Sequence, residues 1–328
     1  MHYAPPLLHI PDGFLDLVVS LLCWAMTAFI LAVAISRTNK SLGEKQVPLM
    51  GVMAAFIFAA QMINFPVAGG TSGHLLGGAL AAIILGPWSA MLVMTAVIAV
   101  QGLLFQDGGL LVMGANILNM GILTAAIGYG LYRGAFGSSR SVRLAVAGIA
   151  AWLSVIAGAL ATSLQLWLSG TSNLQTVVLA MLSVHAVIGL GEALITVAAL
   201  TFIFQTRPDL LDEKSLAAQS GRGWVFAGVA ISLIVILLSP LASVNPDGLN
   251  RVATDLGFIH SAQLTKGPFA GYVIPFLANS SLGKILAGLI GAAVVLTLAF
   301  VIGRSLQKKS QDEEVKRPVK NTLANRRS

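Results

Sequence analysis

Long apolar runs separated by short polar segments constrain the fold of this chain more than any other feature. The first run covers residues 15–35, and comparable runs recur as far as residue 302. A run of about 20 apolar residues is what an α-helix needs to cross the hydrocarbon core of a bilayer. With 56% hydrophobic and 10% charged residues, the composition excludes an ordinary soluble domain. The sequence therefore predicts an all-α, polytopic helical membrane protein in the cytoplasmic membrane.

About nine membrane passes are predicted. The apolar runs are residues 15–35, 47–64, 74–85, 87–105, 115–132, 144–168, 176–204, 224–241 and 284–302. The third run has only 12 residues, too few to cross a bilayer alone, and Gly86-Pro87 ends it. It is counted as a pass because the distribution of basic residues requires an odd number of crossings.

Lysine and arginine fall asymmetrically between the two sides of the predicted topology. The predicted topology has the N-terminus outside and the C-terminus in the cytoplasm. Of the 20 lysine and arginine residues, Arg251, Lys266 and Lys284 then lie on the outer side, and all the others lie on the cytoplasmic side. Inner loops rich in Lys and Arg are the normal signature of orientation. The net charge of +7 thus reflects the basic residues on the cytoplasmic side, and the basic tail is expected to contact anionic membrane lipids. No nucleic-acid partner is expected.

Five parts follow from these runs. They are an extracytoplasmic N-terminal segment (1–14), a seven-span membrane core (15–205), a cytoplasmic linker (206–223), a two-span extension (224–303) with an outer loop (244–282), and a basic cytoplasmic tail (304–328). Within the outer loop, Leu249, Val252 and Leu256 recur at helical spacing, which predicts an amphipathic helix.

Histidine is concentrated toward the outer side of this topology, at His2, His9, His74, His185 and His260. Imidazole is the commonest metal ligand and suits nickel, copper, zinc and cobalt, whereas the single cysteine cannot build a thiolate site. One interpretation is a site for a divalent ion at an outer entrance; the other is that each histidine is a hydrogen-bonded loop residue. His74 follows a glycine-rich break, NFPVAGGTSGHLLG at 64–77, and such backbone is tolerated at membrane depth only inside protein or beside a wet cavity.

Several long motifs resemble those of the CbiM/NikM family, the substrate-binding membrane components of cobalt and nickel energy-coupling factor transporters. The motifs are LHIPDGFL at 8–15, PVAGGTSGHLLG at 66–77, QGLLFQDGG at 101–109, GANILNM at 114–120 and HAVIGLGEALIT at 185–196. The extension, with NPDGLN at 245–250, resembles the PDGLE segment of fused NikMN proteins, with Asn250 in place of the usual Glu.

The resemblance implies a ligand set for the ion. In these proteins the ion is held by an N-terminal amine, the backbone amide nitrogen and imidazole of the next residue, and the histidine of the GGTSGH loop. The matching positions here are Leu8, His9 and His74. Four nitrogens in a plane suit Ni(II), whereas Zn(II) prefers a tetrahedral site.

The chain departs from this pattern at its N-terminus, because seven residues precede Leu8. Three explanations stay open. Translation starts at position 8, or the leader is trimmed to that position, and in both cases residue 8 supplies the amine. Alternatively, Met1-His2 furnishes the amine, amide and imidazole, and His9 is a further ligand.

Five other polar residues are candidates for additional or supporting roles at the site: Asn64, Gln101, Asn116, His185 and Glu192. Asparagine and glutamine within apolar spans usually form hydrogen bonds between helices, which favours a structural role for Gln101 and Asn116. His185 and Glu192 share one helix face, and a carboxylate at that depth indicates either a tether between helices or part of the ion's exit route.

The resemblance implies the substrate-capture membrane subunit of an importer, with Ni(2+) or Co(2+) as the transported substrate. The implied partners are an EcfT-type membrane subunit (CbiQ/NikQ) and EcfA-type ATPases (CbiO/NikO). No phosphate-binding loop of the G-x-x-x-x-G-K-[ST] type occurs in this sequence, so the chain is not expected to be an enzyme. The alternative is a self-sufficient secondary transporter or channel for divalent metal ions, with His185 and Glu192 on a proton-coupled path.

Overall fold

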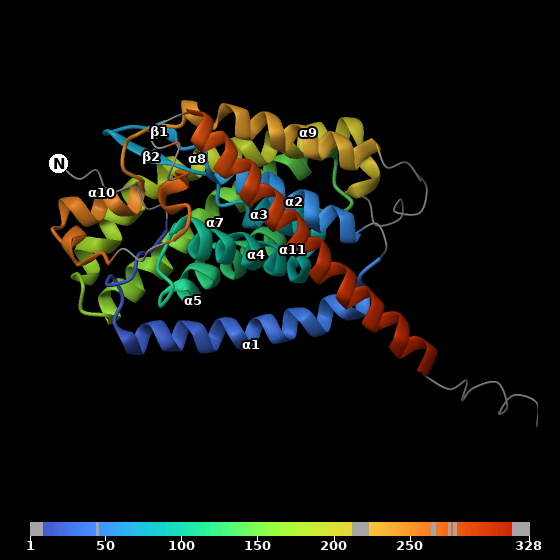
Figure 1. Ribbon diagram of the computed structural model, residues 1–328, viewed down its shortest axis with the longest axis horizontal. Coiled ribbons are helices and arrows are strands. Elements are labelled where there is room, and N and C mark those ends of the chain that lie inside the picture. Colours follow the sequence, from blue (N-terminus) through green and yellow to red (C-terminus); the bar gives the residue numbers. More distant parts are fainter. Residues whose placement is uncertain are drawn as a thin grey trace, which may run out of the picture.

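The computed structural model describes residues 9–43, 46–211, 223–263, 267–274, 277 and 281–316 of the 328-residue chain. The molecule is an elongated bundle of helices that run roughly along one axis (Figure 1). Its α-helices are α1 (Leu17–Ser41), α2 (Gln46–Gln61), α3 (Gly78–Leu85), α4 (Pro87–Phe105), α5 (Met113–Asn116), α6 (Thr124–Tyr132), α7 (Arg140–Leu168), α8 (Leu174–Thr206), α9 (Gly223–Leu238), α10 (Gly248–Asp255) and α11 (Ser281–Lys316). The predicted all-α membrane fold is confirmed.

Shorter elements complete the bundle. A π-helix, η1 (Ile117–Leu123), joins α5 to α6, and two strands, β1 (Phe65–Val67) and β2 (Thr71–Gly73), pair antiparallel in the 64–77 segment. Short 3₁₀ turns are η2 (Arg133–Ala135), η3 (Pro208–Leu210), η4 (Ser239–Leu241), η5 (Ile259–Ser261) and η6 (Ala270–Tyr272).

Seven helices of the described chain are long and apolar enough to cross a membrane: Leu17–Lys40, Pro87–Phe105, Met113–Ala135, Arg140–Leu168, Leu174–Thr206, Gly223–Leu241 and Ser281–Lys309. The apolar helix α2 is shorter, at 16 residues. Together with α3, these elements correspond to the nine predicted segments. The number of passes and their orientation stay predictions.

The third predicted segment, 74–85, differs from expectation. Its first four residues are not helical, and α3 begins only at Gly78, after Gly77 takes a left-handed φ of 82°. All eight residues of α3 are buried, and the helix packs against α4, α6 and α7. Because protein surrounds it on every side, α3 does not need the length of a lipid-exposed helix.

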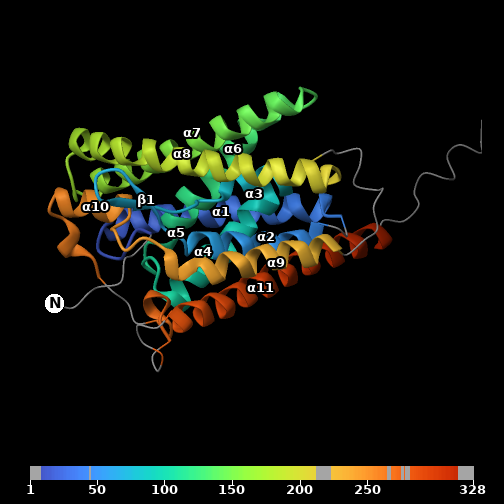
Figure 2. The ribbon, with the colours of Figure 1, turned by 90° about the horizontal axis from the view of Figure 1, so that it is seen from above.

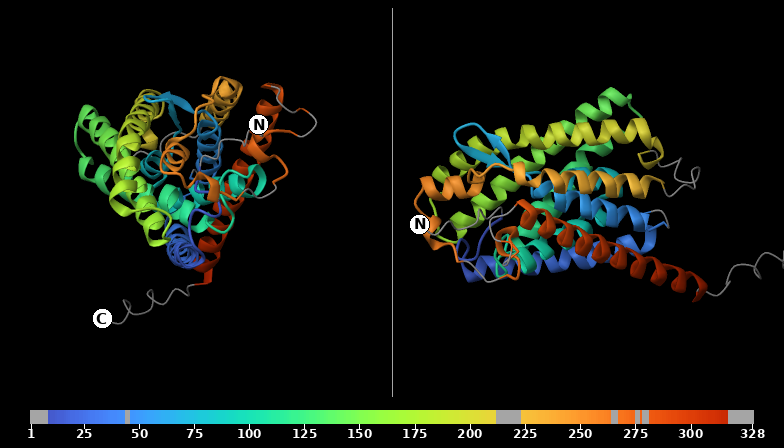
Figure 3. Two further views of the ribbon diagram at one scale, coloured as in Figure 1. Left: turned by 90° about the vertical axis from the view of Figure 1, so that its left-hand side faces the viewer. Right: turned by 45° about the horizontal axis from the view of Figure 1, so that its top comes forward.

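The loops and strands gather at the two ends of the bundle (Figures 1, 2 and 3). One end, which we call the histidine end, carries β1, β2, α10 and the start of α1 (Figure 1). The other, the basic end, carries the C-terminal ends of α1, α8 and α11 (Figure 1). Basic residues lie on or next to these helix ends: Arg37, Lys40, Arg207, Arg304 and Lys308, with Arg140 and Arg143 bonded to the backbone of Thr201 and Leu211. This separation agrees with the charge asymmetry from which the topology is predicted.

The C-terminal extension packs closely on the preceding helices. α9 and α11 pack against α2, and α11 also reaches α4. At the histidine end, α10 packs on α8 and β2, with Leu249 and Val252 buried as its periodicity predicts. Asn250, which the same pattern places on the polar face, is also buried, and its backbone N–H donates to Asp247 at the start of the helix.

Candidate metal site

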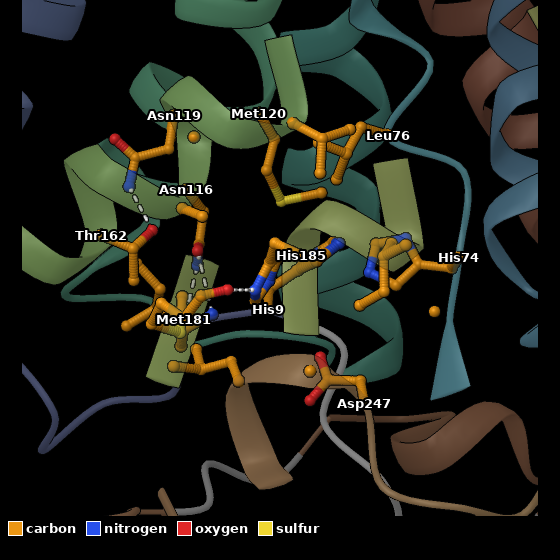
Figure 4. Close-up of a pocket in the computed structure, with 18 residues that line it drawn as sticks. His9, His74, Leu76, Asn116, Asn119, Met120, Thr162, Met181, His185 and Asp247 are labelled. Carbon is orange, nitrogen blue, oxygen red and sulfur yellow. Dashed lines mark hydrogen bonds between the residues drawn. The ribbon is translucent and has the colours of Figure 1, made fainter. Parts of the chain in front are cut away.

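A small cavity of about 70 Å³ lies at the histidine end, where the N-terminal segment, the β2–α3 loop, η1, α7, α8 and α10 meet. Its walls include His9, His74, His185, Asn116, Met120 and Asp247 (Figure 4). Pockets for organic ligands enclose about 300–1,000 Å³. This cavity therefore suits an ion with a few waters better than an organic substrate.

Two histidines from distant parts of the sequence face each other across this cavity. The ring centres of His9 and His74 lie 5.8 Å apart, with the ring planes inclined by 60°. Imidazole nitrogen binds divalent metals at about 2.0–2.1 Å, which places an ion roughly 3 Å from each ring centre. At this separation, one ion between the two rings is within reach of both. Both side chains are buried.

The hydrogen bonds of the rings fix which nitrogen is available. His9 Nδ1 lies 2.9 Å from the Asp107 carbonyl oxygen, His74 Nδ1 lies 3.0 Å from that of Leu75, and His185 Nδ1 lies 2.8 Å from that of Met181. A carbonyl oxygen only accepts, so a neutral His9 or His185 ring carries its proton on Nδ1 and its lone pair on Nε2. His9 Nε2 is buried with no hydrogen-bond partner in the described part of the chain.

His9 is held in place by the residues that follow it. Asn116 donates to the Ile10 carbonyl oxygen and accepts from the Ile10 N–H, both at 3.0 Å. The Asp12 carboxylate accepts three backbone N–H bonds from residues 110–112. These bonds fasten the segment after His9 onto the loop before α5.

His74 is positioned through a buried carboxylate on α8. Glu192 Oε2 accepts from the Leu76 N–H at 2.6 Å, and Oε1 accepts from the Gly77 N–H at 2.9 Å. The side chain is fully buried and does not line the cavity. Glu192 therefore ties the loop that carries His74 to α8.

The extension closes the remaining side of the cavity. The Ser72 N–H donates to the Pro246 carbonyl oxygen at 2.8 Å, and the Asp247 Oδ1 caps α10 by accepting the Asn250 N–H at 2.7 Å. Burial raises the pKa of Asp247 to about 6, against the lowering effects of its backbone bonds and of nearby His74. An acidic side chain thus stands at the wall of a cavity lined by histidines (Figure 4).

The sequence candidates divide between the cavity and its supports. Asn116 and His185 line the cavity, whereas Asn64, Gln101 and Glu192 do not. Leu8 and His2 lie outside the described residues. Sequence reasoning missed Asp247, Met120 and Met181 as lining residues, although Asp247 belongs to the NPDGLN motif and could have been inferred from it.

Side chains alone do not complete a metal site in the described part of the chain, where no cluster of three or more His, Cys, Asp or Glu residues is placed to hold an ion. The implied planar set also needs His9 Nδ1, because only that nitrogen closes a small chelate ring with the residue's own amide nitrogen. In the structure His9 Nδ1 instead contacts the Asp107 carbonyl oxygen. Forming the planar set therefore requires the His9 ring to turn.

Residues 9–210 match the family model of CbiM, described as the cobalt uptake substrate-specific transmembrane region. The chain belongs to the CbiM family. A second model, the PDGLE domain, matches residues 222–308, so this CbiM-family protein carries a C-terminal PDGLE domain. The predicted resemblance to CbiM/NikM with a NikN-like extension is confirmed.

Individual relatives agree with the family match. A putative fused nickel transport protein NikMN of Archaeoglobus fulgidus is 34% identical over 90% of this chain and 98% of its own length. A cobalt transport protein CbiM of Sorangium cellulosum is 34% identical over 62% of this chain and 95% of its own. The crystal structure of a truncated transition metal transporter superposes with a TM-score of 0.54 and 34% identity, covering 60% of this chain and 98% of that one.

Proposed function

We propose that this CbiM-family protein is the substrate-capture membrane subunit of an energy-coupling factor importer for nickel or cobalt. It binds the divalent ion at its outer face, and the ion is the transported substrate. The observation that carries the proposal is the pair of buried rings of His9 and His74, 5.8 Å apart in an ion-sized cavity. The relatives described as nickel and cobalt transport proteins support the same cargo.

The proposed ligands are His9 and His74, completed by nitrogen from the segment ahead of His9. Nδ1 of His9 and Nδ1 of His74 each contact a backbone carbonyl oxygen, an arrangement that favours metal binding through Nε2 of the same ring. If the mature chain starts at residue 8, its amine and the His9 amide join the set once the His9 ring turns. If the leader remains, Met1-His2 supplies the nitrogens and His9 binds through Nε2.

Energy for uptake is proposed to come from separate chains, an EcfT-type membrane subunit (CbiQ/NikQ) and EcfA-type ATPases (CbiO/NikO). The alternative, a self-sufficient secondary transporter, needs Glu192 on a proton path. That carboxylate accepts two backbone N–H bonds and stays out of the cavity, which favours a supporting role instead.

Uptake of radioactive nickel into liposomes tests the proposal. The chain reconstituted with its EcfT-type and EcfA-type partners should accumulate the ion only when ATP is supplied, and His74→Ala should abolish uptake. Accumulation by the chain alone, in vesicles without any ATPase, would contradict the capture-subunit role and favour the secondary transporter.

The extension is proposed to help load or retain the ion, because Asp247, Gly248 and Leu249 line the cavity. Deleting residues 224–303 should lower uptake in the reconstituted system while the preceding helices still insert. Unchanged uptake by the shortened chain would reject this role.

A further inference from the structure

A second, larger cavity of about 610 Å³ lies toward the basic end, between α2, α8 and α9. α9 packs against α2 and α11, whereas α8 packs mainly against α7, so α8 and α9 leave a groove between them. We propose that this cavity, the α8–α9 groove, binds an acyl chain of an anionic phospholipid whose phosphate lies beside Arg207.

The lining of the groove matches an acyl chain. Its walls are aliphatic and aromatic side chains, among them Val52 and Phe56 of α2, Ala199 and Phe202 of α8, and Ala227 and Ile231 of α9. Arg207 is the one charged residue among the described residues that line it, and it follows the last residue of α8. An occupant with a long apolar body and a single anionic end fits this distribution.

The length of the groove distinguishes a lipid from a partner helix. On α8 the lining extends from Ile195 to Thr206, about 17 Å at 1.5 Å per residue. The hydrocarbon core of a bilayer is about 30 Å thick, so the groove is about one leaflet deep. A transmembrane helix of a partner needs a contact surface across both leaflets, whereas an acyl chain anchored at Arg207 ends near the midplane.

The mouth of the groove has the chemistry of a membrane interface. The Arg207 guanidinium lies 5.6 Å from the centre of the Trp224 ring, and Trp224 also lines the groove. Tryptophan and arginine are the residues that anchor helix ends at the headgroup level. Arg140 and Arg143 lie over the ring of Phe204, which does not line the groove, so Arg207 is the cation at the mouth among the described residues. A lipid phosphate is the anion available at that depth.

Native mass spectrometry of the full-length protein tests the proposal, with phosphatidylglycerol and phosphatidylcholine as probes in mild detergent. Wild type should retain phosphatidylglycerol. Ala227→Phe fills the groove and should lose the lipid, whereas the matched variant Ala230→Phe, exposed on the same helix outside the groove, should retain it. Arg207→Gln should reduce the preference for phosphatidylglycerol over phosphatidylcholine about fivefold, the effect of one basic residue near an anionic lipid.

Equal retention of phosphatidylglycerol by Ala227→Phe and Ala230→Phe would overturn the proposal. Loss of co-purified transporter subunits from Ala227→Phe, with lipid retention unchanged, would also overturn it and assign the groove to a partner helix. Ala198→Phe fills the groove from the α8 side and should lose the lipid too, which separates groove filling from a folding defect of α9.

Discussion

Replacing Glu192 by alanine should weaken metal binding although the side chain touches neither histidine. The carboxylate accepts the N–H groups of Leu76 and Gly77 at 2.6 and 2.9 Å, and hydrogen bonds to charged groups contribute about 1.5–3 kcal/mol each. Without them, the loop that carries His74 must be ordered by the ion itself. We expect the affinity for Ni²⁺ to fall by about 10–100-fold, the usual effect of removing an outer support of a metal ligand.

Equilibrium dialysis of Ni²⁺ against full-length protein in detergent measures this effect. Thr196→Val is the matched control, because Thr196 lies one turn further along α8, is equally buried, and its hydroxyl has no hydrogen-bond partner in the described part of the chain. Glu192→Gln keeps one acceptor oxygen and should fall between wild type and Glu192→Ala. Nickel affinity of Glu192→Ala equal to that of Thr196→Val would refute the reasoning.

Three further predictions concern one residue beside the cavity and two that line it. Gly108→Ala should weaken Ni²⁺ binding by about tenfold or more, as measured by titration calorimetry. Gly108 has a φ of 102°, which strains any residue with a side chain, and a Cβ at this position would lie 2.9 Å from the His9 Cβ. Asn116→Leu breaks both bonds to the Ile10 backbone and should cost about 1–3 kcal/mol of stability per orphaned group, visible as a lower melting temperature. Asp247→Asn should flatten the pH dependence of stability. The pKa of Asp247 is raised to about 6 in the folded protein, so the folded wild type binds a proton at this carboxyl more tightly than the unfolded chain does. The stability of the wild type should therefore fall as the pH rises from about 4 to 6. Equal melting curves for Asp247→Asn and wild type across that range would contradict the third prediction.

Much of the helical layout follows from local sequence. α4 covers Pro87–Phe105, the predicted bounds, because Pro87 suits the first helical turn and Gln106 ends the helix in a left-handed conformation. α10 is predictable from the spacing of Leu249 and Val252. The late start of α3 is not, because it depends on Gly77 and on the non-local bond to Glu192.

The candidate site shows the same division. His9 and His74 can be selected from their motifs and their predicted side of the membrane. Asp247 can be selected from the NPDGLN motif, but its place beside the cavity depends on the contacts of residues 245–247 with Ser72, which is far away in the sequence. The role of Asp12 as an acceptor for the loop before α5 likewise depends on chain segments about 100 residues apart.

The metal content of purified full-length protein tests the central claim most directly. The protein is incubated with Ni²⁺ or Co²⁺ and dialysed, and its metal content is measured by inductively coupled plasma mass spectrometry. We expect one metal ion per chain in wild type and none in His9→Ala or His74→Ala. Retention of the ion by both variants would contradict the assignment of the site to these two rings.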